Sequence, residues 1–108
     1  MKRKKHHNLY VVELDRAVLK EPRFIESNPR YDPEKPCLYV GMTGLSPEER
    51  FYNHKAGYKS NKYVKKYGLR LCPRLYEEHN PLSYDDAREM ETELARQLRE
   101  KGYAVWQK

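Results

Sequence analysis

One acidic residue stands on an otherwise apolar helix face, and a carboxylate in that position could support chemistry. Residues 83 to 101 have a helical pattern, and at about 100° per residue Glu91 points into the middle of the apolar face. That face consists of Ala87, Met90, Leu94, Ala95 and Leu98. Because burial of an unpartnered carboxylate costs several kcal/mol, Glu91 needs a cation beside it. A metal ion or an arginine would serve.

Two tyrosines are predicted to share a sheet face with this carboxylate nearby. Residues 9 to 14 are β-branched and aromatic and predict a strand with Tyr10 on one face, and residues 37 to 41 predict a second strand with Tyr39 and Gly41 on one face. If the strands pair as a hairpin, the two phenols stand side by side. Glycine at position 41 would let a ligand approach the backbone closely.

A short helix is predicted to supply the cation. Ser46 offers an N-cap, Pro47 suits the first helical position, and the following acids complete a capping box. The helix should run to about residue 56 and end near Gly57. Arg50 and His54 then lie one turn apart on the same face, directed at the tyrosines.

Four short motifs follow one another in this order across nearly the whole chain. They are Asn8-Leu9-Tyr10, then Tyr39-Val40-Gly41, then Arg50 with His54, and finally Ala87 with Glu91. Each is common alone, but together they resemble the ordered motifs of the GIY-YIG nuclease domain. The chain is most similar to a small stand-alone bacterial-type member of that superfamily.

The resemblance implies a divalent-metal-dependent DNA endonuclease that hydrolyses phosphodiester bonds in DNA repair, recombination or restriction. By this analogy Glu91 is the ligand of Mg²⁺, with Mn²⁺ as a substitute, and Tyr10 is the base for the attacking water. Tyr39 would supply a positioning hydroxyl, and Arg50 would act as the phosphate clamp. A single inward carboxylate is sufficient for Mg²⁺, which keeps most of its waters.

Two residues could act as the general base. A free tyrosine titrates near about 10, so Tyr10 needs a neighbouring cation, which Lys55, His54 or the metal could provide. His54 is the alternative base, because its ordinary pKa of about 6.5 needs no adjustment. A structural alternative also stands, in which Glu91 forms a buried salt bridge with Arg50 and no reaction takes place.

The chain departs from the family pattern at three positions. Asn8 stands where the first motif usually has glycine, Met42 stands where many members have lysine, and Gln107 is the nearest candidate for an asparagine that usually follows the final helix. These departures permit a second hypothesis, a nucleic-acid-binding module of the same fold without turnover. In a third, the protein docks an acidic partner through its basic residues.

Residues 51 to 76, called the basic segment below, contain no Asp or Glu in a chain of net charge +6. Tyr58, Tyr63 and Tyr67 alternate with its lysines, which suits phosphate contacts flanked by stacking rings. The segment favours DNA as the partner, with RNA as an alternative. The predicted nucleic-acid-binding residues are Gly41, Lys55, Lys59, Lys62, Lys65, Lys66 and Arg70.

The 108 residues are enough for one domain. Residues 1 to 7 are expected to form a flexible basic tail, and the prolines of residues 15 to 36 predict a long insertion between the first two strands. Further elements are expected over residues 61 to 67 (helix), 69 to 76 (an edge strand with Pro73) and 103 to 106 (strand). The prediction is an α+β fold with a small, mainly antiparallel sheet of three to four strands covered by helices.

The composition also limits the classes of protein to which the chain could belong. No apolar run is long enough to cross a membrane, and the basic start lacks the apolar stretch of a signal peptide, so a cytoplasmic protein is expected. Cys37 and Cys72 should then be free thiols with a packing role. Gly41 and Gly44 lack the spacing of a nucleotide-binding loop, so no nucleotide cofactor is expected. Sequence specificity would need the insertion or a protein partner.

Overall fold

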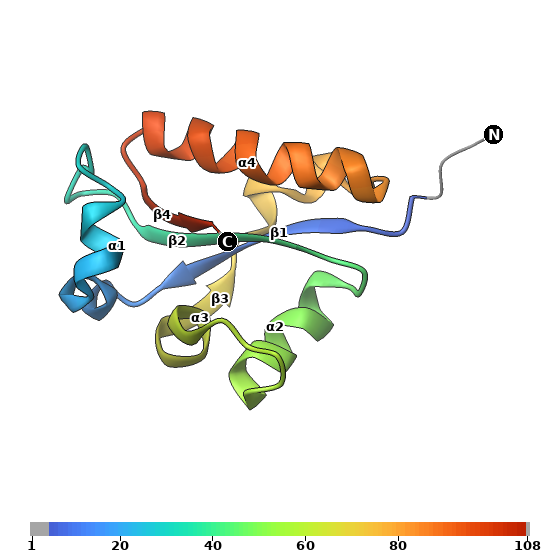
Figure 1. Ribbon diagram of the computed structural model, residues 1–108, viewed down its shortest axis with the longest axis horizontal. Coiled ribbons are helices and arrows are strands. Elements are labelled where there is room, and N and C mark those ends of the chain that lie inside the picture. Colours follow the sequence, from blue (N-terminus) through green and yellow to red (C-terminus); the bar gives the residue numbers. More distant parts are fainter. Residues whose placement is uncertain (1–4, 108) are drawn as a thin grey trace.

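A four-stranded mixed sheet lies between helical layers in the computed structural model, which describes residues 5–107 (Figure 1). The strands are β1 (Asn8–Leu14), β2 (Cys37–Thr43), β3 (Gly68–Leu71) and β4 (Ala104–Gln107), in the order β3-β1-β2-β4. β1 is antiparallel to β2 and β3, and β4 is parallel to β2. The predicted α+β fold, with a small and mainly antiparallel sheet covered by helices, is confirmed.

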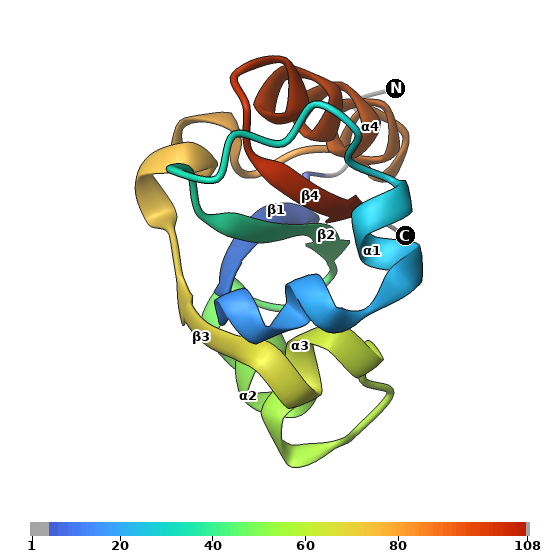
Figure 2. The same ribbon diagram turned by 90° about the vertical axis from the view of Figure 1, so that its left-hand side faces the viewer.

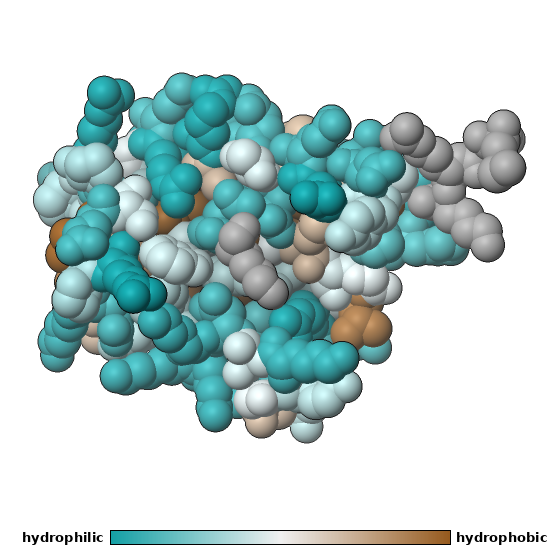
Figure 3. All heavy atoms as spheres, viewed as in Figure 1, coloured by the Kyte–Doolittle hydropathy of each residue, from teal (hydrophilic) through white to brown (hydrophobic). Residues whose placement is uncertain are grey.

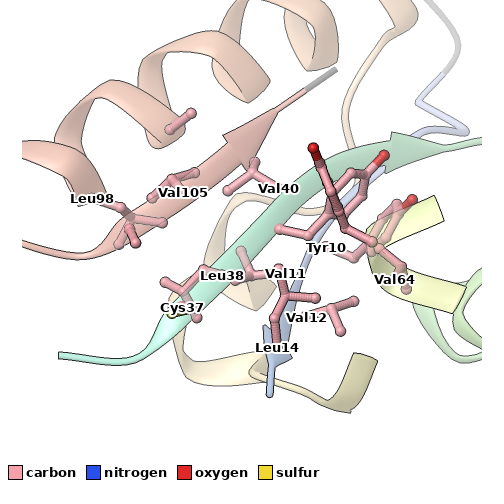
Figure 4. Close-up of a cluster of buried hydrophobic side chains, with 14 of the residues drawn as sticks. Tyr10, Val11, Val12, Leu14, Cys37, Leu38, Val40, Val64, Leu98 and Val105 are labelled. Carbon is pink, nitrogen blue, oxygen red and sulfur yellow. The ribbon is translucent and has the colours of Figure 1, made fainter. Parts of the chain in front are cut away.

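The helices cover both faces of this sheet. Figure 2 shows α4 (Tyr84–Glu100) on one face, with α2 (Pro47–Ala56) and α3 (Lys62–Tyr67) on the other. Figure 4 shows the side chains of Val40 and Val105 on the α4 side. Residues that alternate along β1 and β2 therefore contact different helices, so the sheet can bring groups from both layers to one place.

The predicted insertion between β1 and β2 contains two short helices. It forms a 3-10 helix over Arg16–Lys20 and then α1 (Pro22–Glu26). Asp15 caps the 3-10 helix by accepting a hydrogen bond from the Ala17 amide at 2.8 Å. Phe24 of α1 is fully buried, which attaches the insertion to the core instead of leaving it as an open loop.

The strand predicted over residues 69 to 76 is wrong beyond Leu71. β3 ends there, and Pro73–Leu75 forms a 3-10 helix. Proline has no N–H to donate to a strand ladder but suits the first turn of a helix, where that donor would have no partner. β3 does lie at the edge of the sheet, as predicted.

Local capping signals fix the two helices that carry the candidate site. Ser46 and Glu49 form a complete capping box at the start of α2, and Gly57 ends that helix with φ of 87°. Ser83 caps α4 by accepting a hydrogen bond from the Asp86 amide at 3.2 Å. Both predicted helix starts are confirmed.

The start of the described chain is anchored to the loop before α4. The His7 amide donates to the Leu82 carbonyl at 2.9 Å, and the Leu82 amide donates back at 2.8 Å. The Asn80 side chain pairs with both backbone groups of Leu9, at 2.7 and 2.8 Å. The tail predicted over residues 1 to 7 is therefore wrong at His7, and residues 1 to 4 lie outside the described part of the chain.

The core occupies both sides of β1 and β2. Figure 4 shows Tyr10 beside Val64 on one side and Leu98 with Val105 on the other. Cys37 is buried and Cys72 half-buried, and both are free thiols as predicted. The face shown in Figure 3 is mainly hydrophilic. Among the described residues, no helix is long and apolar enough to span a membrane.

Candidate active site

An open cavity of about 620 Å³ lies where the ends of β1 and β2 meet α2 and α4. Four of the five predicted catalytic residues line it, namely Tyr10, Tyr39, Arg50 and Glu91. The other lining residues are His7, Met42, Thr43, Gly44, Tyr84 and Arg88. The fifth predicted residue, His54, is completely buried behind Tyr10. Side chains far apart in the sequence are therefore brought to one place.

The two tyrosines stand side by side, as predicted. Their ring centroids are 6.0 Å apart, and their side chains are 1% (Tyr10) and 3% (Tyr39) exposed. Gly41 pairs directly opposite Tyr10, and a Cβ at that glycine would lie 2.7 Å from Cζ of the Tyr10 ring. The tyrosine ring fills the space over the glycine, which gives a packing reason for glycine at this position, and the contact of Gly41 with nucleic acid stays a prediction.

His54 holds Tyr10 in place. Its Nδ1 accepts a hydrogen bond from the Asn61 amide at 3.0 Å, and its Nε2 lies 2.7 Å from the Tyr10 hydroxyl oxygen. Burial, reinforced by the charge of Arg50, lowers the pKa of His54 to about 4, so the ring is neutral at pH 7. Since Nδ1 is an acceptor, Nε2 carries the hydrogen and donates it to Tyr10.

Burial dominates the acidity of both phenols. It raises the pKa of Tyr10 well above the ordinary value, with Tyr39 adding to the rise and Arg50 opposing it. Burial also raises the pKa of Tyr39; there the charge of Glu91 adds to the rise, while Arg50 and a hydrogen bond with Tyr10 oppose it. Arg50 is thus the protein cation that favours ionisation of these phenols.

Arg50 is fixed by the loop that follows its own helix. Its two terminal nitrogens donate to the carbonyls of Tyr58 at 3.3 Å and Lys59 at 2.7 Å. Within residues 5–107 no ion pair joins Arg50 to Glu91, so the structural salt bridge considered from the sequence is not formed. A guanidinium has five N–H donors, so Arg50 keeps donors for a phosphate.

Glu91 is half-buried at the cavity wall, one turn from the buried Ala87. Its Oε1 accepts a hydrogen bond from the Gln107 side chain at 2.8 Å. Gln107 lies on β4, beyond the end of α4, so the last strand orients the carboxylate of the helix. The described residues contain no cluster of three His, Cys, Asp or Glu side chains that could hold a metal. A single carboxylate still fits Mg²⁺, which is bound through one or two carboxylates and retained waters.

Three of the predicted nucleic-acid-binding cations contact the protein itself. Lys55 donates to the Lys65 and Gly68 carbonyls at 3.0 and 2.9 Å. Lys66 lies 3.8 Å from Glu21, and Arg70 lies 2.6 Å from Glu13. The proposal that Lys55 acts on Tyr10 gains no support, because its ammonium group joins α2 to α3 and β3.

The remaining predicted lysines, Lys59, Lys62 and Lys65, are exposed. Two of the interleaved tyrosines are not available for stacking, because Tyr63 and Tyr67 are buried in the core. Tyr58 is 59% exposed and fits the prediction. The basic segment therefore presents charge at its surface but only one of its three predicted rings.

The cavity wall contains four residues that were not predicted from the sequence, namely His7, Thr43, Tyr84 and Arg88. The rings of His7 and Tyr84 lie 5.2 Å apart at 75°, and the Arg88 guanidinium lies 5.9 Å from the Tyr84 ring centre. The spacing of Tyr84, Arg88 and Glu91 on one helix face could have indicated two of them. His7 gave no local signal, because its position depends on pairing with Leu82.

Comparisons of the chain with protein-family models, with curated proteins and with solved structures found no match. The geometry of the cavity and the chemistry of the residues that line it are therefore the basis for a functional assignment.

Proposed function

We propose that the protein is a divalent-metal-dependent DNA endonuclease of the GIY-YIG kind, which hydrolyses phosphodiester bonds. One observation carries the proposal: Tyr10, Tyr39, Arg50 and Glu91, each from a different element, line a single open cavity. These residues offer a base, a positioning hydroxyl, a phosphate clamp and a hard oxygen ligand. We further expect the protein to work in the cytoplasm on DNA in repair, recombination or restriction.

Tyr10 is the better candidate for the general base. Neither nitrogen of His54 can take a proton from water, since Nδ1 accepts from Asn61 and Nε2 carries a hydrogen. The Nε2–H group instead donates to the phenol oxygen, and a hydrogen bond of this kind stabilises a phenolate. Since burial raises the pKa of Tyr10, the phenol would first have to release its proton to solvent. Arg50 and a bound metal ion would favour that ionisation, and the phenolate would then accept the proton of the attacking water.

Glu91 would hold the metal, and Gln107 would keep its carboxylate oriented. When bound, Mg²⁺ would polarise the phosphate and stabilise the charge that develops on the departing oxygen. Arg50 would donate to the phosphate oxygens from the opposite side of the cavity. Tyr39, beside Tyr10, would position the attacking water.

Nicking of supercoiled plasmid tests the proposal. Wild type should nick with Mg²⁺ or Mn²⁺ and not in EDTA, and Glu91→Gln, which keeps the shape of the side chain, should lose detectable nicking. Glu89→Ala is the matched control, because Glu89 is exposed on the same helix. Nicking that survives in Glu91→Gln, or that persists in EDTA, would overturn the assignment of the metal to Glu91.

A second candidate is a nucleic-acid-binding module without turnover. Two observations favour it: burial raises the pKa of Tyr10, and the half-buried Met42 stands in the cavity wall where many family members have lysine. Under this hypothesis the protein binds DNA but cuts neither plasmid nor branched DNA, with either metal. If it binds no DNA at low salt, the third hypothesis, in which the basic segment docks an acidic protein, replaces both.

A further inference from the structure

A second wall of the cavity is built from His7, Tyr84 and Arg88, and the proposed hydrolysis uses none of them. Tyr84 is 52% exposed although it contacts both neighbours. An aromatic ring in an open cavity offers a flat apolar surface to a ligand. This wall is therefore available for a part of the substrate that does not react.

The wall is rigidly joined to the candidate metal ligand. Tyr84 is the first residue of α4, Arg88 follows one turn later, and Glu91 comes next on the same face. His7 is fixed by its two backbone hydrogen bonds with Leu82, just before that helix. A group bound on this wall would thus have a fixed distance from Glu91.

The charges of the cavity favour an anion with more than one phosphate. Arg50 and Arg88 come from helices on opposite faces of the sheet, and Glu91 is the single acidic residue among the lining residues. Across residues 5–107, the Arg88 guanidinium makes no side-chain hydrogen bond or ion pair, and its one described interaction is with the Tyr84 ring. Its donors can therefore bind a phosphate without breaking a protein contact.

We propose that this wall is a nucleotide subsite beside the reaction centre. Arg88 binds a phosphate next to the one held by Arg50, and an unpaired nucleobase stacks on the Tyr84 ring. The volume of about 620 Å³ lies within the range of roughly 300–1,000 Å³ typical of small-ligand pockets, which suits one nucleoside with its phosphates. The inference rests on the proposed endonuclease function and specifies how its substrate is bound.

Binding measured in EDTA, where metal-dependent cleavage cannot occur, tests the stacking part. The probes are two fluorescein-labelled single-stranded oligodeoxynucleotides of equal length, one with thymine bases and one fully abasic. Wild type should bind the base-bearing strand about five-fold or more tightly in fluorescence anisotropy, since stacking of one base is worth at least about that factor. Tyr84→Ala should lose this preference, and Tyr84→Phe should keep it.

The matched control is Tyr52→Ala, since Tyr52 is 72% exposed on α2 and is not among the residues that line this cavity. It should keep the preference for bases. Arg88→Ala should weaken both strands equally and reduce the salt slope by about 0.7, the value for one phosphate of a single strand. Equal affinity of wild type for both strands, or a preference that survives in Tyr84→Ala, would overturn the inference.

The plasmid assay separates this inference from the proposed function. A protein that prefers bases through Tyr84 but never nicks DNA has the nucleotide subsite without the endonuclease activity. A protein that nicks DNA and shows no such preference is the endonuclease without this subsite. Thermal unfolding of each variant, followed by circular dichroism, should match wild type because both side chains are exposed.

Discussion

The cavity and the basic segment use similar residue types in different ways. Tyr10 in the cavity wall and His54 behind it are buried, and the Tyr10 hydroxyl and both ring nitrogens of His54 have partners from other parts of the chain. In the basic segment, Lys59 and Lys62 are exposed and lie over rings of their own neighbours. The difference shows that burial holds a polar group in one geometry, whereas an exposed charged group can adopt many geometries. Removal of a single side-chain atom should therefore have a large effect on activity or stability in the cavity and a small effect in the basic segment.

The largest effect is expected from removal of one oxygen in the cavity. Tyr10→Phe should reduce plasmid nicking by roughly 10²–10⁴-fold, the usual contribution of a general base. It should also lower the free energy of unfolding by about 1–3 kcal/mol, because the buried Nε2–H of His54 loses its acceptor. Nicking rates and urea denaturation measure the two effects.

Tyr76→Phe is the matched control for this variant. The Tyr76 hydroxyl is buried and has no hydrogen-bond partner among residues 5–107, so its removal should leave stability unchanged or increase it. If Tyr10→Phe and Tyr76→Phe behave alike in both measurements, the contrast between a fixed site and the rest of the molecule fails.

The second effect is a loss of stability in acid. Because the pKa of His54 is lowered to about 4 in the folded protein, the unfolded chain binds more protons between pH 6.5 and 4. The free energy of unfolding should therefore fall as the pH drops through this window, by up to about 3 kcal/mol at about 1.4 kcal/mol per pKa unit. Denaturation curves of wild type should show this dependence, and those of His54→Gln should lack most of it.

A smaller effect is expected where the sheet makes room for Tyr10. Gly41→Ala would place Cβ 2.7 Å from the tyrosine ring, so the ring must move, at a cost of about 1–3 kcal/mol. Gly44→Ala is the control, because its Cβ would have its nearest neighbour 3.7 Å away. Thermal melts of both variants measure the difference. Equal stability of the two would mean that the ring has space to adjust.

The smallest effects belong to the basic segment. Lys62→Ala should reduce the slope of log affinity for DNA against log salt by up to about 0.9, provided that Lys62 contacts one phosphate. Lys66→Ala should change it less, because Lys66 already lies 3.8 Å from Glu21. Both variants should keep nicking activity near wild type. A large loss of nicking in either would place these lysines in the reaction instead of on the binding surface.

The amino-acid sequence by itself determined the elements whose signals are local. The capping pattern at Ser46 predicted the start of α2, and the helical pattern from residue 83 predicted the start of α4, which Ser83 caps. These signals are local because a cap satisfies the amides of its own helix. The apolar face around Glu91 also followed from helical periodicity. The signal at Pro73 was read incorrectly, since a proline fits both an edge strand and a first helical turn.

Only the tertiary structure decided what the side chains of the cavity contact. Asn61 sets the tautomer of His54, Tyr10 fills the space over Gly41, and the pairing with Leu82 brings His7 into the wall. These contacts join residues whose spacing in the chain carries no period, so no local pattern encodes them. They form because each buried polar group must find a partner and each gap must be filled when the elements pack together.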